Sequence, residues 1–298
     1  MKLSMYTGFT RYWEQHGAEQ TALYLRELGL GGAEILSNAH SERTFAPSLE
    51  EARELREIFE AHEIHFSCYS VGADLLSYPE QAVERLCYFA EVAAVLGSPY
   101  LHHTLIPFLS LPPHAPSFQD ALRLILPHAR YVADYASNLG VTCLYEPQGM
   151  FINGTKGMSA FWEAISSFCG NVGICGDVGN TLFVDESPLD FFALFATEIR
   201  HVHPKDYCPA STEETYVFST RSGRRITECS LGQGEIPLRQ CMDLLYTAGY
   251  RGDLSLKNLH PKDWSRGLQE DIAYTKKFYY NKERVAFATR SLLLSNYL

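Results

Sequence analysis

One stretch of the chain decides the fold: residues 172–206 read VGICGDVGNTLFVDESPLDFFALFATEIRHVHPKD. A short β-like run, Val172 to Asp177, comes before a helical pattern, Pro188 to Thr197, and a second β-like run, Arg200 to His203, follows. Strand, helix and strand in this order are the unit from which parallel sheets are built. We therefore expect a parallel βαβ unit here.

The same alternation runs along nearly the whole chain. Other strands are predicted at Leu3 to Tyr6, Gly32 to Leu36, His65 to Tyr69, Tyr100 to Thr104, Thr142 to Glu146 and Asp253 to Lys257. Other helices are predicted at Ala18 to Leu28, Ser48 to His62, Glu80 to Leu96, Phe118 to Leu139, Met158 to Cys169, Pro237 to Ala248 and Ser265 to Tyr279. Eight strands and eight helices in 298 residues fit a single (β/α)8 TIM barrel, and an open doubly wound sheet is the alternative.

Two internal stretches and the C-terminus interrupt this alternation. Residues 104–117 are rich in proline and residues 206–230 are polar. Both follow a strand, so both are expected to be irregular and to overhang the mouth of the barrel. The barrel is predicted to span residues 1–281, and residues 282–298 are predicted to form a C-terminal helical extension. This extension would pack on the barrel or on a partner subunit. In the second case the protein would be a homo-oligomer.

Charge and cysteine usage narrow the class of ligand and the compartment. The formal net charge is −10 and no long run of lysine or arginine is present, which disfavours nucleic acid and anionic membranes as partners. A small-molecule substrate is therefore favoured. The eight cysteines form no CxxC pair and sit mostly in apolar stretches, as buried thiols do. No apolar run is long enough to span a bilayer, and a cytoplasmic protein is expected.

Polar side chains at the ends of four consecutive strands are predicted to point into the barrel. Side chains alternate across a strand, and the apolar residues that meet the helices fix which side is outward. With Tyr145, Ile174, Val202 and Leu256 outward, the inward residues at the carboxyl ends are Glu146, Asp177, His203 and Lys257. Two carboxylates, an imidazole and an ammonium group should thus meet at the mouth.

Such a group of charges needs neutralising. A lone acid at a strand end is usually a helix cap or a solvated loop residue, but unpaired buried charges cost several kcal/mol. A divalent cation bound by Glu146, Asp177 and His203 would neutralise the carboxylates. Mixed oxygen and imidazole ligands suit Mn²⁺, Mg²⁺, Co²⁺ or Zn²⁺.

At these residues the chain resembles the xylose isomerase-like TIM barrel superfamily of sugar phosphate isomerases and epimerases and the related inosose dehydratases. The motifs that carry the resemblance are Tyr145-Glu146-Pro147, Gly176-Asp177-Val178-Gly179-Asn180, His201-Val202-His203-Pro204-Lys205-Asp206 and Leu231-Gly232-Gln233-Gly234-Glu235-Ile236-Pro237. The resemblance implies that Glu146, Asp177 and His203 are metal ligands. It also implies a glutamate at the end of the eighth strand, as fourth ligand and as one of two acid/base carboxylates. Lys257 stands there instead.

The resemblance implies proton abstraction next to a carbonyl through an enediolate, with a sugar, sugar phosphate or cyclitol as substrate. Lys257 leaves two hypotheses for this chemistry. In the first, a metal enzyme uses Glu146 as the base and Lys257, His103 or Glu235 as the second acid/base, and a dehydratase or lyase fits as well as an isomerase. In the second, the Lys257 ammonium replaces the metal by bridging Glu146 and Asp177, in a metal-free enzyme or a catalytically silent sugar-binding protein.

A third hypothesis, a metal-dependent abasic-site endonuclease, is disfavoured, because Asn180 stands where that branch needs a histidine and the net charge is acidic. Four residues are predicted to contact the substrate: His103, Lys205, Glu235 and Tyr69. His102 and His103 lie next to each other on one strand, so only one of them can face the lumen, and His103 is predicted to do so because it is nearer the mouth. Glu34 is a lesser candidate for a polar contact.

Overall fold

In a computed structural model of the chain, residues 2–107, 114–148, 152–259 and 263–277 are described. Eight parallel strands close into a barrel in the order β1-β11-β7-β6-β5-β4-β3-β2. They are β1 (Leu3–Met5), β2 (Gly32–Asn38), β3 (His65–Gly72), β4 (Tyr100–His103), β5 (Thr142–Tyr145), β6 (Val172–Asp177), β7 (Ile199–His203) and β11 (Leu254–Leu256). Because β1 pairs with both β2 and β11, the sheet has no free edge, and the single (β/α)8 TIM barrel is confirmed over the open sheet.

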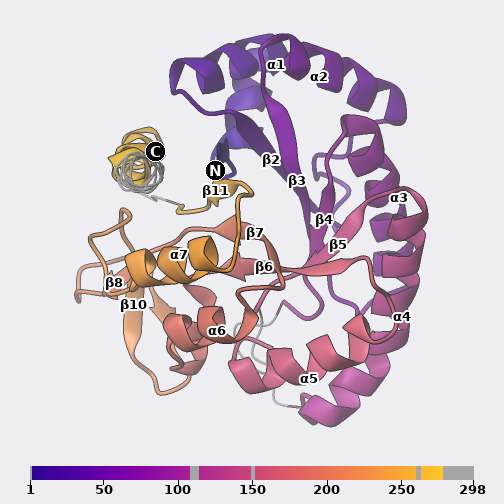
Figure 1. Ribbon diagram of the computed structural model, residues 1–298, viewed down its shortest axis with the longest axis vertical. Helices are drawn as coiled ribbons and strands as arrows, with labels where there is room; N and C mark the ends of the chain where they lie inside the picture. The colour runs from indigo at the N-terminus through magenta and orange to yellow at the C-terminus, as the bar shows by residue number, and fades with distance from the viewer. Residues whose placement is uncertain (1, 108–113, 149–151, 260–262, 278–298) are drawn as a thin grey trace, which may run out of the picture.

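Helices surround the strands, and α1 to α5 form an arc around them in Figure 1. The helices are α1 (Phe9–Glu27), α2 (Leu49–Ala61), α3 (Pro79–Leu96), α4 (Phe118–Asn138), α5 (Thr155–Ser166), α6 (Pro188–Phe195) and α7 (Leu238–Thr247). Residues 264–277 are also helical. Ser48 and Glu51 form a capping box at the start of α2, since each side chain accepts from the other's backbone N–H. None of the described helices is both long and apolar enough to span a membrane.

The first helix differs from the prediction. It begins at Phe9 instead of Ala18 and kinks at Gly17, whose φ of 79° lies in the left-handed region. The early turns are held by aromatic contacts, because Tyr12 stacks on Tyr24 and Trp13 packs edge-on against Phe45. Tertiary packing of these rings therefore extends the helix beyond its predicted start.

The polar stretch after β7 is only partly irregular. It forms an antiparallel sheet of β8 (Tyr207–Pro209), β9 (Phe218–Ser219) and β10 (Arg225–Glu228) with β10 in the middle. Asp185, which follows the 3-10 helix η1 (Asn180–Val184), accepts hydrogen bonds from Thr220 and Ser222 and so ties the sheet to the segment after β6. The expectation of an irregular loop was wrong for these strands. In the proline-rich stretch, residues 108–113 lie outside the described residues.

The strand alternation separates an outer core from the lumen. The outward Tyr145, Ile174, Val202 and Leu256 are all buried in the main core that joins strands to helices. The inward Cys68, Leu144 and Cys175 form a small separate cluster with Tyr100. This cluster fills the lumen below the mouth, so the barrel is a packed core with one open end.

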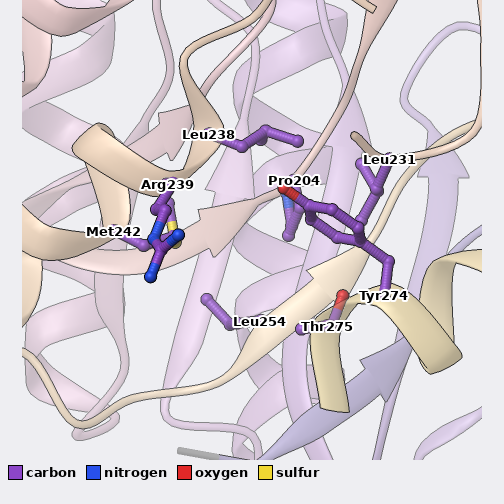
Figure 2. A pocket seen from close by; sticks show the side chains of 8 residues that line it. All are labelled: Pro204, Leu231, Leu238, Arg239, Met242, Leu254, Tyr274 and Thr275. Atoms are coloured by element: carbon purple, nitrogen blue, oxygen red, sulfur yellow. The ribbon is translucent and has the colours of Figure 1, made fainter. Parts of the chain in front are cut away.

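A space between the barrel and two of its helices is too small for a substrate. It lies between α7, β11 and the helix of residues 264–277, with a volume of about 20 Å³ (Figure 2). Its lining is mostly apolar: Pro204, Leu231, Leu238, Arg239, Met242, Leu254, Tyr274 and Thr275. Since a cavity of about 10 to 15 Å³ is needed for one water molecule, this space has room for about one water molecule and not for a substrate. The predicted C-terminal extension, residues 282–298, lies outside the described residues and stays a prediction.

Candidate active site

A pocket of about 280 Å³ opens at the carboxyl end of the barrel strands. It lies between the strand ends and the β8-β10-β9 sheet, and its lining includes Tyr6, Ser70, His102, Glu146, Gln148, Asn180, Lys205, Tyr207, Tyr216, Phe218, Glu228 and Lys257. Its volume is close to the lower limit of about 300 Å³ for small-molecule pockets. The lining mixes hydrogen-bonding groups with aromatic rings, which suits a small polar ligand.

Lys257 lies between the two carboxylates at the mouth. Its Nζ is 2.8 Å from Glu146 Oε2, 3.1 Å from Glu146 Oε1 and 3.1 Å from Asp177 Oδ2. Burial lowers the pKa of Lys257, but Glu146 and Asp177 outweigh that effect and hold its pKa well above the ordinary value. Burial raises the pKa of Glu146, and Lys257 and His102 outweigh it and hold that pKa well below the ordinary value. Lys257 is therefore an ammonium and Glu146 a carboxylate.

The short turn after β6 orients Asp177. Its Oδ1 accepts from the backbone N–H groups of Gly179 at 3.0 Å and Asn180 at 3.1 Å. Its Oδ2 forms an ion pair with Lys257, although the geometry is not that of a hydrogen bond. The same oxygen lies 3.6 Å from Lys205 Nζ. Lys205 also lies 3.3 Å from the Tyr207 hydroxyl, so a second ammonium group lies in the pocket as predicted by alternation.

Beneath these groups, five side chains form a closed ring, four of them from strands and one from Glu146, which directly follows β5. Glu34 Oε1 lies 2.9 Å from His203 Nε2, and His203 Nδ1 lies 3.4 Å from Glu146 Oε2. On the other side Ser70 donates to Glu34 and lies 2.8 Å from His102 Nδ1, and His102 Nε2 is 3.4 Å from Glu146 Oε1. Every member is buried. The ring fixes Glu146 from below while Lys257 holds it from above.

Glu34 was underrated as a site residue by sequence reasoning. It has no exposed surface, and besides His203 and Ser70 it contacts His201 Nε2 at 2.8 Å. Burial raises the pKa of Glu34, but His203 and His201 outweigh that effect and hold the pKa well below its ordinary value. The sequence contained a sign of this role. Glu34 is the third residue of β2 and points inward, and two residues of β7, His201 and His203, also point inward.

The prediction that His103 faces the lumen was wrong, and His102 lies there instead. Leu101 pairs in register with Cys143, an outward residue, so His102 is inward and His103 outward. The His103 ring lies edge-on to Tyr145, and burial lowers its pKa to about 4. The pairing of β4 with β5 sets this orientation, and closeness to the mouth was the wrong reason for choosing His103.

Two other predicted substrate contacts also lie outside the pocket. Tyr69 is outward, where it stacks on Phe89 of α3 and its hydroxyl lies 2.9 Å from Ser37 Oγ. Glu235 pairs with Arg224 and its side chain is 34% exposed, on a loop that does not line the pocket. The structure therefore does not place these two side chains in the pocket, because a residue near a strand end or in a family motif can still face away from the lumen.

Among the described residues, three groups could offer a metal ion three ligand atoms that lie within 4.8 Å of one another. One is the predicted set of Glu146, Asp177 and His203. The others are Glu34 with His201 and His203, and His102 with Glu146 and Cys175.

The predicted set does not fit a divalent cation as it is folded. The Lys257 ammonium lies between the carboxylates where the cation would bind. At a separation of about 4 Å and an effective dielectric constant of about 20, repulsion between an ammonium and a dication is about 8 kcal/mol. Both nitrogens of His203 also face carboxylate oxygens, those of Glu34 and Glu146.

The fold and the mouth define a class, that of (β/α)8 barrels with ionisable groups gathered at the carboxyl ends of strands five to eight. Within that class the chain belongs to the family of the Xylose isomerase-like TIM barrel, whose model matches residues 23–278. No curated protein matches the chain significantly.

Solved structures share the architecture at low sequence identity. An L-ribulose 3-epimerase is 17% identical with a TM-score of 0.73, covering 97% of this chain and 97% of its own. D-psicose 3-epimerase from Clostridium cellulolyticum H10, solved with D-tagatose, is 16% identical with a TM-score of 0.71, covering 94% and 99%. The IolI protein, solved with a zinc atom, is 16% identical with a TM-score of 0.70, covering 94% and 97%. Such identities show a shared fold.

Proposed function

We propose that the chain is an isomerase or epimerase of a small sugar or cyclitol, and that it moves a proton next to a carbonyl group. The observation that carries the proposal is the Lys257 ammonium held between Glu146 and Asp177 at the mouth of a small polar pocket. A carboxylate and a fixed cation side by side are the two groups that this chemistry needs. The epimerases that share the fold support the substrate class.

In the proposed mechanism, the substrate carbonyl oxygen accepts a hydrogen bond from Lys257. Glu146, released from that lysine, removes the proton from the adjacent carbon, and the electron pair of the broken C–H bond forms the enediolate. The ammonium groups of Lys257 and Lys205 stabilise the negative oxygen. For an isomerisation, Glu146 returns the proton to the former carbonyl carbon, and the substrate hydroxyl proton moves to the former carbonyl oxygen. For an epimerisation, the ammonium group of Lys257 or Lys205 donates a proton to the other face of the original carbon, and the proton held by Glu146 then restores that ammonium group.

A specific observation favours a second candidate, a sugar-binding protein without turnover. Both oxygens of Glu146 lie within 3.1 Å of the Lys257 ammonium, and that contact weakens the carboxylate as a base. If a bound ligand does not draw Lys257 away from Glu146, the pocket holds the ligand and no reaction takes place.

Exchange of substrate hydrogen for solvent deuterium separates the two candidates. We expect NMR of ketoses, ketose phosphates and keto-cyclitols in D₂O to show exchange next to the carbonyl of one class, in the presence of a metal chelator. The isosteric Glu146→Gln should lower the exchange rate by about 100-fold or more, because the base is removed. Glu235→Gln, a carboxylate outside the pocket, is the matched control and should retain the rate. Binding of a ligand by calorimetry without any exchange would favour the second candidate.

A further inference from the structure

We infer that Lys257 is a built-in counter-ion that takes the place of a divalent cation, and that its ammonium group keeps the mouth from binding one. This inference does not depend on the proposed reaction, because it concerns which cation the carboxylates accept.

The positions of the charges support the inference. Lys257 Nζ contacts Glu146 and Asp177 at 2.8 and 3.1 Å, and the side chain is only 12% exposed. A metal ion bridging the same two carboxylates would need the same space. If the lysine moved into solvent, two buried carboxylates would lose their nearest ammonium group, which is unfavourable.

The surroundings are balanced for a monovalent cation at this place. Three buried carboxylates, those of Glu34, Glu146 and Asp177, lie among the Lys257 and Lys205 ammonium groups and the His203 imidazole. Each carboxylate has a cationic or hydrogen-bonding partner within the described residues. A dication added to this set would bring two further positive charges beside carboxylates that already have partners.

The backbone of β11 sets the direction of the lysine. Leu254 and Leu256 are buried in the outer core, so the alternation turns residue 257 into the mouth. A glutamate at the same position would direct a third carboxylate to the place where the ammonium now lies. The sequence change from Lys257 to glutamate should therefore turn a self-neutralised site into a four-ligand site of Glu146, Asp177, His203 and residue 257.

Direct measurement of Mn²⁺ binding tests the inference. Electron paramagnetic resonance detects free Mn²⁺, and its signal is lost when the ion binds. We would measure this loss for the unaltered full chain and for the variants Lys257→Glu and Lys257→Met. We expect the unaltered chain to bind no Mn²⁺ at micromolar metal, and Lys257→Glu to bind a full equivalent at least about 100-fold more tightly. Lys257→Met removes the charge without adding a ligand and should fall between them. Lys2→Glu makes the same charge change at an exposed residue before β1, at the opposite end of the barrel, and should gain nothing.

Asp177→Asn locates any bound metal at the mouth. In the Lys257→Glu background it should abolish the new binding. Uptake of Mn²⁺ by the unaltered chain that is lost in Asp177→Asn would overturn the inference. So would a folded Lys257→Glu that stays without metal, or, if that variant does not fold, a Lys257→Met that binds no better than the unaltered chain.

Discussion

Glu34 is the residue that organises the interior beneath the mouth. One carboxylate accepts from Ser70 and contacts the histidines at 201 and 203, which come from the opposite side of the barrel. Removing one partner of a buried charge pair is far more costly than removing an exposed one, because the remaining groups stay desolvated and unpaired.

Replacing Glu34 should therefore lower the free energy of unfolding strongly. We expect about 3 to 5 kcal/mol for Glu34→Leu, measured by urea denaturation, because two imidazoles and a hydroxyl lose their acceptor. Glu34→Gln keeps one acceptor oxygen and should cost less. Glu235→Leu breaks a partly exposed pair and should cost about 1 kcal/mol or less. Equal losses for the Glu34 and Glu235 leucine variants would show that the ring has no special structural role.

At the scale of elements, the segment from β7 to α7 forms one wall of the pocket. Asp206 anchors it, because Oδ2 accepts from the N–H groups of Gly232 and Gly234 at 2.9 and 3.0 Å, and Oδ1 accepts from Ile236 at 3.1 Å. A Cβ at Gly234 would meet Asp206 Oδ1 and the Tyr207 carbonyl oxygen. The glycine-rich motif thus allows one carboxylate to bind several backbone N–H groups.

Gly234→Ala should consequently loosen this wall. We expect a loss of roughly 1 to 3 kcal/mol in thermal unfolding and faster hydrogen exchange of the backbone amides in residues 206–236, since the hydrogen bonds to Asp206 must lengthen. Gly170→Ala is a matched control, because a Cβ there meets nothing within 4 Å. Unchanged exchange in Gly234→Ala would mean that the motif does not depend on this close approach.

For the whole molecule, buried ionisable groups make the barrel sensitive to acid. The pKa of His103 is lowered to about 4 by burial, so between pH 6.5 and pH 4 the unfolded chain binds a proton that the folded chain does not. Stability is therefore lost as the pH falls through this window. The lowered pKa values of Glu34 and Glu146 add a further loss below the ordinary carboxylate range.

The free energy of unfolding should accordingly fall by about 1.4 kcal/mol per pH unit for each such histidine between pH 6.5 and pH 4. His103→Phe should flatten this dependence, because a ring of similar size facing Tyr145 cannot take up a proton. Urea denaturation at a series of pH values measures the slope. The same substitution at the exposed His114 is the control. A slope unaltered in His103→Phe would rule out this histidine as a source of the acid sensitivity.

The sequence by itself determined the order of the eight barrel strands and the helices between them. It also showed which strand ends carry charged residues. A strand has a side-chain period of two, and parallel strands in a barrel end at the same mouth. These two facts bring Glu146, Asp177, His203 and Lys257 together without any knowledge of distances. They favour a closed barrel but leave an open doubly wound sheet as the alternative, and the pairing of β1 with both β2 and β11 decides between them.

The tertiary structure alone decided which neighbouring residue faces the lumen and what each charge touches. His102 replaces His103 because register between strands, which depends on barrel closure, sets the inward phase. Glu34 meets His203 although 169 positions separate them in the sequence, because β2 and β7 face each other across the lumen. The contact of Lys257 with both carboxylates follows from the same closure, since only the folded barrel brings the end of the last strand within contact distance of the fifth and sixth strand ends.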